Sequence, residues 1–379
     1  MKILFFYPED PLAKTQGNNA RALALLTYFK EKGYLVDFVC HDSHIRGKIT
    51  PETIKALKEE GLIEKGTILS RRKRSGVKYL LHSLKYKLKG IFTNYNKEFD
   101  RVRFGQLEEF NAFVSGNTYD VAIITYVYYY KFLEAKHLNA KTKIVDTHDF
   151  ITAQFKDSKY FNDEIKTLNL FDKIWSISLE EQFVFSQFLK DKVHLIPHAV
   201  EVNKNSIKSE QKEIDVIYVA GDNPHNIKAI NWFFEEVYNL LPTDINITII
   251  GKICRVIPEK PNITKIEFVE DLSSYYQKSK VAMCPMLSGT GVKIKVVEAL
   301  AYNIPVVCNV RGVDGLLNKT NNGCLVSNDP KQFANYLTDL VSNIEFHSNQ
   351  AEKAKQFYNE TLSEVSVKQE LDAFFQSIN

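Results

Sequence analysis

The sequence lacks a strong net charge, paired cysteines and any metal-ligand spacing, and each absence excludes a class of protein. Its 49 lysines and arginines oppose 46 aspartates and glutamates, which leaves a net charge of +3. This balance does not indicate a nucleic-acid partner. The five cysteines are widely spaced, without a CxxC pair or a Cys/His cluster. We therefore expect buried, reduced thiols, no metal site and a cytoplasmic protein.

Long hydrophobic runs are also missing. No apolar run approaches the roughly 20 residues that a membrane span requires. The N-terminus, MKILFFYPED, has one lysine and a short apolar run followed by acids. This pattern predicts a first β-strand rather than a signal peptide.

A dinucleotide fingerprint is absent from the loop after this strand, YPEDPLAKTQGNNARA. A G-x-G-x-x-G motif is expected there in nicotinamide and flavin enzymes, but only Gly17 is present. The absence argues against an oxidoreductase. Gly17 opens a predicted helix whose free N–H groups can face a ligand. The alternative, equally open, is a helix simply capped by Asn18 or Asn19.

The sequence does contain short apolar runs that alternate with longer amphipathic ones. KILFFY, NNARALALLTYFKEKG and YLVDFVC predict a strand, a helix and a strand, hence a parallel sheet with crossover helices. The alternation stops in the polar stretch HAVEVNKNSIKSEQKE and resumes at IDVIYVAG. We predict an α/β protein with two Rossmann-like, doubly wound domains facing a cleft. The domains are residues 1–200 and 201–360, followed by a helix at 361–379.

Polar residues follow one predicted strand of the first domain. KIVDTHDF ends with Asp146, His148 and Asp149. Ligands of open α/β sheets bind outside the carboxyl ends of the strands. Histidine can donate to a sugar hydroxyl or a phosphoryl oxygen, so the three residues are candidate catalytic groups. The alternative is a turn in which Asp146 or Asp149 caps the next helix.

The stretch SGTGVKIKVVEALAYNIPVV, residues 288–307, carries the sharpest functional pattern. Gly289, Thr290 and Gly291 follow a predicted strand, so backbone N–H groups can approach an anion. Lys293 and Lys295 are predicted in the first helical turn. A helix dipole favours acids at this end, so two lysines there indicate a bound phosphate.

Glu298 extends this pattern from an anion site to a diol site. It follows Lys295 by three residues and Gly291 by seven, so we expect all three on one helix face. A carboxylate there can accept hydrogen bonds from the two hydroxyls of a ribose. The alternative is a surface Lys295–Glu298 ion pair, although the apolar neighbours of Glu298 favour partial burial.

A second phosphate contact is predicted at VAGDNPHNIKAINWFF. Gly221 makes the turn after the first strand of the second domain, and the helix is expected to begin near Asn226. Lys228 then lies in its first turn, where it could contact a diphosphate. The alternative is an ordinary solvated lysine.

These motifs together resemble a known family. GTGVKIKVVEALAYNIPVVCNVRGVDGL resembles the C-domain signature of family-4-type glycosyltransferases, the glycosyl transferases group 1 with the GT-B fold. NIKAINWFFEEV and IEFVEDLSSYYQKSKVAMCP are similar to further segments of that domain. The match to the N-terminal domain is looser.

The resemblance implies an enzyme, a hexosyl- or other glycosyltransferase. It would transfer sugar from a nucleoside diphosphate sugar, with retention and without metal or cofactor. A glycan, lipid-linked or protein acceptor, as in polysaccharide biosynthesis, would receive the sugar. By resemblance, Glu298 would hold the ribose, and Lys228, Lys295 and the Gly289–Gly291 backbone the diphosphate. His148 would lie near the reacting sugar, and the helix at 361–379 would return to the first domain.

Two departures from the family pattern keep other functions open. Thr290 stands where many members carry the first glutamate of an E-x7-E pair, which contacts the donor sugar. His198 and Ala199 replace a usual Asn-Gly. A non-catalytic glycosyltransferase-like partner subunit is therefore one alternative. A nucleotide-sugar epimerase of the same fold is another, although it should carry more acid/base carboxylates than the sequence offers.

A basic stretch, RRKRSGVKYLLHSLKYKLKG, begins at Arg71. Apolar residues recur in it at helical spacing, at Val77, Leu80, Leu81, Leu84 and Leu88. The pattern predicts an amphipathic cationic helix over residues 71–89, suited to an anionic membrane surface or a lipid-linked acceptor. The protein would then be peripheral on the inner face of the membrane. The alternative is a solvated helix packed on its domain.

Overall fold

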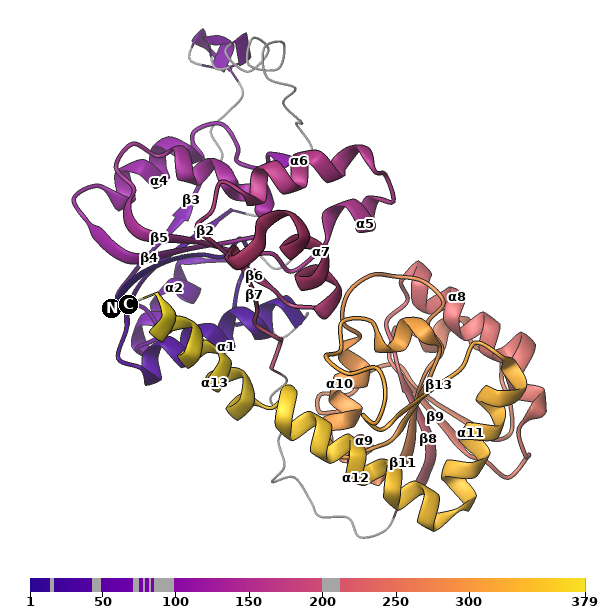
Figure 1. Cartoon of the computed structure of the whole chain (residues 1–379). Coiled ribbons are helices and arrows are strands. Elements are labelled where there is room, and N and C mark those ends of the chain that lie inside the picture. Colours follow the sequence, from indigo (N-terminus) through magenta and orange to yellow (C-terminus); the bar gives the residue numbers. More distant parts are fainter. Residues whose placement is uncertain are drawn as a thin grey trace. The chain divides into compact units, whose positions relative to one another are not determined.

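The computed structural model describes residues 1–13, 17–42, 49–70, 75–77, 79–81, 83–84, 99–199 and 212–378. The chain divides into two compact units (Figure 1). The N-terminal unit comprises Met1–Ile177, Glu181–Leu195 and Phe374–Asn379, and the C-terminal unit comprises Ser178–Glu180 and Ile196–Ala373.

The N-terminal unit is built on a seven-stranded parallel sheet in the order β3-β2-β1-β4-β5-β6-β7. Its strands are β1 (Lys2–Phe6), β2 (Leu35–His41), β3 (Lys65–Leu69), β4 (Thr118–Thr125), β5 (Asn139–Asp146), β6 (Lys173–Ser176) and β7 (Val193–Leu195). The strand order reverses between β1 and β4. In open α/β sheets this switch point is where the carboxyl ends of the strands hold a ligand.

Helices connect these strands, as the alternating apolar pattern predicts. They are α1 (Gly17–Glu31), α2 (Pro51–Glu59), α4 (Gln106–Val114), α5 (Ile151–Phe155), α6 (Lys159–Leu168) and α7 (Leu179–Leu189), with 3-10 helices at Val127–Glu134 and Lys190–Lys192. The apolar positions of α1 at Ala22, Leu25, Leu26 and Phe29 are all buried. The helical period found in the sequence therefore marks the face that packs on the sheet.

The C-terminal unit has a six-stranded parallel sheet in the order β10-β9-β8-β11-β12-β13. Its strands are β8 (Ile214–Val219), β9 (Ile247–Ile250), β10 (Ile263–Ile266), β11 (Ser279–Cys284), β12 (Val306–Cys308) and β13 (Cys324–Val326). The order reverses between β8 and β11. Two doubly wound parallel sheets confirm the predicted α/β fold class.

Apart from the last of them, the helices of the C-terminal unit lie on both sides of this sheet (Figure 1). They are α8 (Pro224–Trp232), α9 (Ser273–Lys278), α10 (Ile294–Ala301), α11 (Pro330–Ser342), α12 (Ile344–Thr361) and α13 (Glu364–Ser377). A π-helical turn at Phe233–Val237 and 3-10 turns at Tyr238–Leu240, Lys252–Val256 and Val310–Val313 complete the unit. Helix α10 follows β11 directly and is the helix that carries Lys295 and Glu298.

The end of α13 belongs to the N-terminal unit, where two phenylalanines anchor it. The Phe374 ring lies 5.2 Å from Trp175 of β6 and 4.9 Å from His194 of β7. The Phe375 ring stacks on Tyr28 of α1 at 6.0 Å. Aromatic pairs at these separations contribute about 0.5–1.5 kcal/mol each beyond their buried area. The chain end thus packs on the first sheet.

Candidate functional site

The loop that connects β11 to α10 contains two glycines. Gly289 and Gly291 have φ angles of +100° and +72°, in the left-handed region that favours glycine. Thr290 lies exposed between them. A Cβ at Gly289 would stand 3.6 Å from the His225 ring. The loop therefore presents a backbone with little side-chain cover, as predicted for an anion site.

Lys293 holds this loop in place. Its Nζ donates hydrogen bonds to the carbonyl oxygens of Thr290 at 3.3 Å and Gly291 at 2.6 Å. Lys293 is buried and caps α10, which begins one residue later, at Ile294. The prediction that Lys293 lies in the first helical turn is therefore wrong. Burial lowers its pKa, and two of its three N–H groups contact the loop backbone.

Lys295 lies in the first turn of α10 and links it to the turn after β8. Its Nζ donates to Asn226 Oδ1 at 2.9 Å and lies 4.7 Å from the centre of the Tyr218 ring. Asn226 Nδ2 donates in turn to the Gly221 carbonyl at 3.0 Å. Burial lowers the pKa of Lys295. Three predicted site elements, Gly221, Lys295 and the glycine loop, therefore lie together.

Helix α8 begins at Pro224, two residues before the predicted start at Asn226. Asn223 caps it, because its side-chain oxygen accepts from the backbone N–H groups of His225 and Asn226, both at 3.0 Å. His225 Nδ1 lies 2.8 Å from Ser288 Oγ, so this helix start also contacts the glycine loop. Because the helix begins at Pro224, Lys228 lies in its second turn and not in the first as predicted, and it is exposed.

Glu298 lies one turn beyond Lys295 and is partly buried. Its Oε2 accepts a hydrogen bond from the Tyr276 hydroxyl at 2.9 Å. The Tyr276 ring stacks on Tyr302 at 5.4 Å, and the Tyr302 hydroxyl donates to Ser273 at 2.6 Å. Burial raises the pKa of Glu298. Within the described residues Lys295 bonds to Asn226 and not to Glu298, so the alternative of a surface ion pair is wrong.

Gly291 does not share a helix face with Glu298, contrary to prediction. It precedes the first helical residue, Ile294, by three positions. Its positive φ makes it part of the turn instead. Lys295 and Glu298 remain one turn apart on the same helix.

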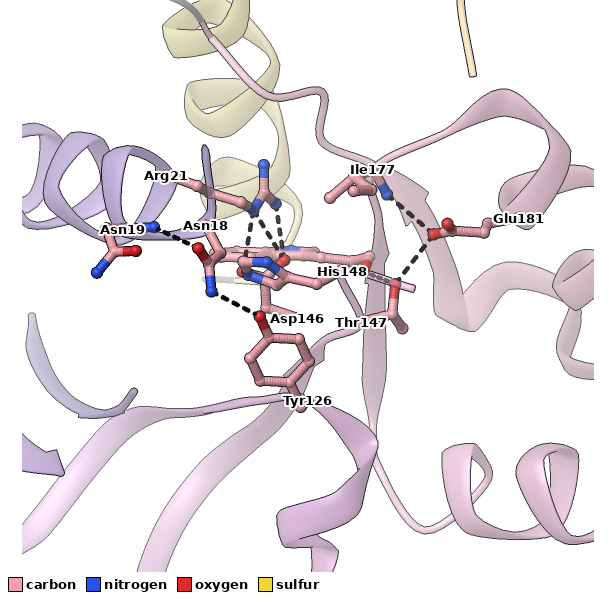
Figure 2. A network of polar contacts seen from close by, with 10 residues as sticks. Asn18, Asn19, Arg21, Tyr126, Asp146, Thr147, His148, Ile177 and Glu181 are labelled. Atoms are coloured by element: carbon pink, nitrogen blue, oxygen red, sulfur yellow. Dashed lines mark hydrogen bonds and ion pairs between the residues drawn. The ribbon is translucent and has the colours of Figure 1, made fainter. Parts of the chain in front are cut away.

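The second cluster of predicted site residues lies at the carboxyl end of β5 (Figure 2). Asp146 is fully buried and forms an ion pair with Arg21 of α1, with Nη2 and Oδ1 at 2.7 Å. His148 Nε2 lies 2.8 Å from Asp146 Oδ2. Burial alone raises the pKa of Asp146, but the charge of Arg21 and the hydrogen bonds from His148 and Arg21 outweigh it and hold the pKa below its usual range.

Tyr126 adjoins this cluster from the end of β4. Its ring lies 4.7 Å from the His148 ring, and its hydroxyl accepts from Asn18 Nδ2 at 3.0 Å. Both Tyr126 and His148 have positive φ angles, 66° and 63°. A strained residue of this kind costs about 1–3 kcal/mol and is found most often at functional sites. The backbone is therefore strained at two neighbouring strand ends of the N-terminal unit.

Asp149 lies beside His148 and is partly buried, which raises its pKa despite the nearby His148 and Arg101. It does not cap α5. Glu164 of α6 does so, because its carboxylate accepts from the backbone N–H groups of Ile151 and Thr152, both at 2.8 Å. The alternative that Asp146 or Asp149 caps the next helix is therefore wrong.

Gly17 is the first residue of α1, and the cap position before it lies outside the described residues. Asn18 and Asn19 both reach toward the loop after β1. Asn18 Nδ2 donates to Glu9 at 3.3 Å, and Asn19 Nδ2 donates to the Asp10 carbonyl. Their side chains therefore tie the helix start to that loop.

Four residues of these two clusters were not predicted from the sequence: Arg21, Tyr126, Asn226 and Glu164. Arg21 and Asp146 are 125 positions apart, so no local pattern pairs them. Asn226 had a weak signal, since it stands at the start of a helix beside the predicted lysine. Tyr126 and Glu164 stand in ordinary apolar and amphipathic stretches of sequence, which gave no signal of a functional role.

Most of the predicted cationic helix over residues 71–89 lies outside the described residues, and so does Leu88. Four of its apolar residues are described and exposed: Val77, Leu80, Leu81 and Leu84. Among the helices that the structure describes, none is long and apolar enough to cross a bilayer. The described residues also contain no cluster of three or more metal-ligating side chains.

Comparison with known sequences finds a family that matches part of the C-terminal unit. Residues 213–343 match the family described as Glycosyl transferases group 1. An uncharacterised 44.6 kDa protein in the cps region of Klebsiella pneumoniae is 24% identical over 264 residues. That match covers 60% of this chain and 66% of the relative, so slightly less than two thirds of the relative is spanned.

Solved structures share the whole fold. TarM of S. aureus, in a complex with UDP, matches with a TM-score of 0.66 at 15% identity over 99% of both chains. HepE of Anabaena, in complex with UDP and glucose, matches with a TM-score of 0.64 at 13% identity over 100% of both chains. Sucrose-phosphate synthase from Thermosynechococcus elongatus matches with a TM-score of 0.69 at 12% identity. This match covers 100% of this chain and 98% of the synthase chain. The predicted resemblance is thus confirmed: the chain has the GT-B fold of these proteins, and its residues 213–343 match the family of glycosyl transferases group 1.

Proposed function

We propose that the protein is a glycosyltransferase that moves a sugar from a nucleoside diphosphate sugar to a glycan, lipid-linked or protein acceptor. The observation that carries this proposal is the position of Lys295 and Glu298, one turn apart on α10 and beside the Gly289–Gly291 loop. An anion site and a carboxylate one helical turn apart fit the diphosphate and the ribose of one nucleotide. The matched family domain includes all of these residues.

The proposed chemistry is electrostatic. As the bond from the sugar to the diphosphate breaks, negative charge develops on the leaving phosphate. Lys295, Lys228 and the loop N–H groups would stabilise that charge in a partly dry site, where such interactions are strongest. We propose that these groups replace a divalent metal, and that the sugar is transferred with retention. His148 and Asp149 of the N-terminal unit would contact the reacting sugar.

The first ligand to test is uridine diphosphate, because the TarM and HepE complexes contain UDP. We expect one nucleotide among UDP, GDP, ADP and CMP, or one of their sugars, to raise the melting temperature of the full chain. A ligand at 100 times its Kd stabilises the folded state by about 2.7 kcal/mol. Differential scanning fluorimetry with EDTA present measures the shift and also tests metal independence.

A non-catalytic partner subunit is the second candidate. Thr290 favours it, because this residue occupies the place of a sugar-contacting glutamate in many members of the family. That function predicts no melting shift with any nucleotide sugar and a stable complex with another protein. A shift with one nucleotide, followed by donor turnover, rules the partner function out.

We propose further that the exposed apolar face of Val77, Leu80, Leu81 and Leu84 contacts an anionic bilayer. The basic residues around it in the sequence match such a surface in charge. Replacing Leu80 and Leu84 with glutamate should reduce binding to phosphatidylglycerol vesicles at least about tenfold, since two buried leucines each contribute roughly 1.5 kcal/mol or more. Vesicle co-sedimentation measures this binding.

Phosphatidylcholine vesicles are the lipid control for this experiment, and Leu170→Glu is the matched variant. Leu170 is an equally exposed leucine after α6, at 56% against 55% for Leu84. Equal binding of wild type and the double variant to phosphatidylglycerol would contradict the assignment of this face.

A further inference from the structure

The N-terminal unit contains a buried arginine whose function the glycosyltransferase proposal does not explain. Arg21 of α1 is 4% exposed, and its guanidinium meets the carboxylate of Asp146, which is 1% exposed. We propose that Arg21 and Asp146 are positioning residues. They would hold His148 with its proton on Nε2 and direct Nδ1 to accept a hydrogen bond from a sugar hydroxyl. The proposal rests on the proposed function only for the identity of that hydroxyl.

The two oxygens of Asp146 have different partners. Oδ1 accepts from Arg21 Nη2 at 2.7 Å and from Nε at 3.1 Å. Oδ2 lies 3.0 Å from Arg21 Nε and 2.8 Å from His148 Nε2. A carboxylate beside a guanidinium carries no proton, so it can only accept. His148 Nε2 must therefore be the donor, which fixes the tautomer of the neutral ring.

The ring of His148 has little freedom to turn. Its backbone is held at a φ of 63°, and the Tyr126 ring lies against it at 4.7 Å. Tyr126 is itself fixed by Asn18, whose Nδ2 donates to its hydroxyl at 3.0 Å. Figure 2 shows Arg21, Asp146, His148 and Tyr126 gathered at the strand ends.

The second ring nitrogen has no protein partner among the residues that the structure describes, since the only hydrogen bond of His148 there is the one through Nε2. With the proton on Nε2, Nδ1 carries a lone pair. Such a nitrogen accepts a hydrogen bond from a hydroxyl group, and it cannot donate to a phosphoryl oxygen. In the neutral ring, Nδ1 therefore suits a sugar hydroxyl rather than a phosphate.

The matched variant is Asp146→Asn, which keeps the shape of the side chain. Arg21 needs an acceptor, so the amide oxygen should take the Oδ1 position, where two guanidinium bonds converge. The amide NH2 then faces His148 Nε2, which must become the acceptor, and the ring proton moves to Nδ1. A wrong tautomer of a carboxylate-held histidine lowers turnover by about 10²–10⁴-fold.

The double variant Arg21→Met/Asp146→Asn separates positioning from a purely structural role. Without the guanidinium, the amide is free to turn its oxygen back to His148, and the Nε2–H tautomer returns. We expect this second substitution to recover at least tenfold of the lost turnover, with little change in the donor KM. A purely structural role predicts a double variant no better than the single one.

Nitrogen-15 NMR of the histidine rings in the full chain, without any ligand, tests the proposal. His148→Gln assigns the signal. We expect a pyrrole-type signal at Nε2 and a pyridine-type signal at Nδ1 in the wild type, exchanged in Asp146→Asn and restored in the double variant. A wild-type proton on Nδ1 would overturn the proposal, even if neither variant folds. This NMR measurement requires no sugar transfer. Its result is therefore independent of whether the proposed function is correct.

Discussion

Replacing Lys295 with methionine is expected to lower the rate of sugar transfer about 10²–10³-fold, the usual effect of removing one group that stabilises a developing anion. Its ammonium lies in the first turn of α10, bonded to Asn226 beside the glycine loop. Methionine keeps the length and apolar volume of the stem, and only the contacts of the ammonium with Asn226 and the Tyr218 ring are lost. The expected change lies in kcat, measured by the release of nucleoside diphosphate.

Lys278→Met is the matched control for this variant. Lys278 pairs with Glu213 at 3.0 Å on the surface of the same unit. Removing a surface ion pair changes stability by about 0–1 kcal/mol, so we expect turnover within a factor of two. An unchanged kcat in Lys295→Met would show that this lysine does not stabilise the leaving diphosphate.

Replacing Glu298 with alanine should weaken nucleotide binding by about 1.5–3 kcal/mol, or roughly 10–150-fold, the range for a lost charge-assisted hydrogen bond. Glu298 is partly buried, and the hydrogen bond from Tyr276 holds its carboxylate in place. Calorimetric titration measures the affinity. Glu352→Ala, at a surface position paired with Lys355 at 3.2 Å, is the control and should bind as the wild type does.

The pH dependence of binding follows from the same carboxylate. Burial raises the pKa of Glu298, so the group takes up a proton at a higher pH than an exposed glutamate. The ionised form is the stronger acceptor for a ribose diol. Nucleotide affinity should therefore fall as pH decreases through this raised pKa, and Glu298→Ala should remove that dependence.

The sequence predicted the parts of the site that depend on local chemistry. The sequence places two glycines after a strand and a lysine and a glutamate on the next helix. In the structure Gly289 and Gly291 lie between β11 and α10, and Lys295 and Glu298 lie on α10. The period of apolar residues also predicted the parallel sheets. These features arise from near neighbours in the chain, and near neighbours are what a sequence pattern records.

Roles that depend on distant contacts could not be predicted. Lys293 and Lys295 look alike in the sequence, but helix α10 begins between them. One therefore bonds the glycine loop and the other bonds Asn226, 69 positions away. Asp146 was predicted as a catalytic group; it forms a buried ion pair with Arg21, and we propose that it positions His148. Only the tertiary fold brings such partners together.

The most direct test of the central claim compares a ribonucleotide with its 2′-deoxy counterpart. Calorimetric titration of the wild type and Glu298→Ala with UDP and 2′-deoxy-UDP, or with the pair whose base gives the largest melting shift, measures the preference for the ribose diol. We predict that the wild type prefers the ribonucleotide about tenfold, since one hydrogen bond to a charged group is worth at least about 1.5 kcal/mol. Glu298→Ala should bind both equally. An unchanged preference in the variant, or no nucleotide binding by the wild type, would contradict the account.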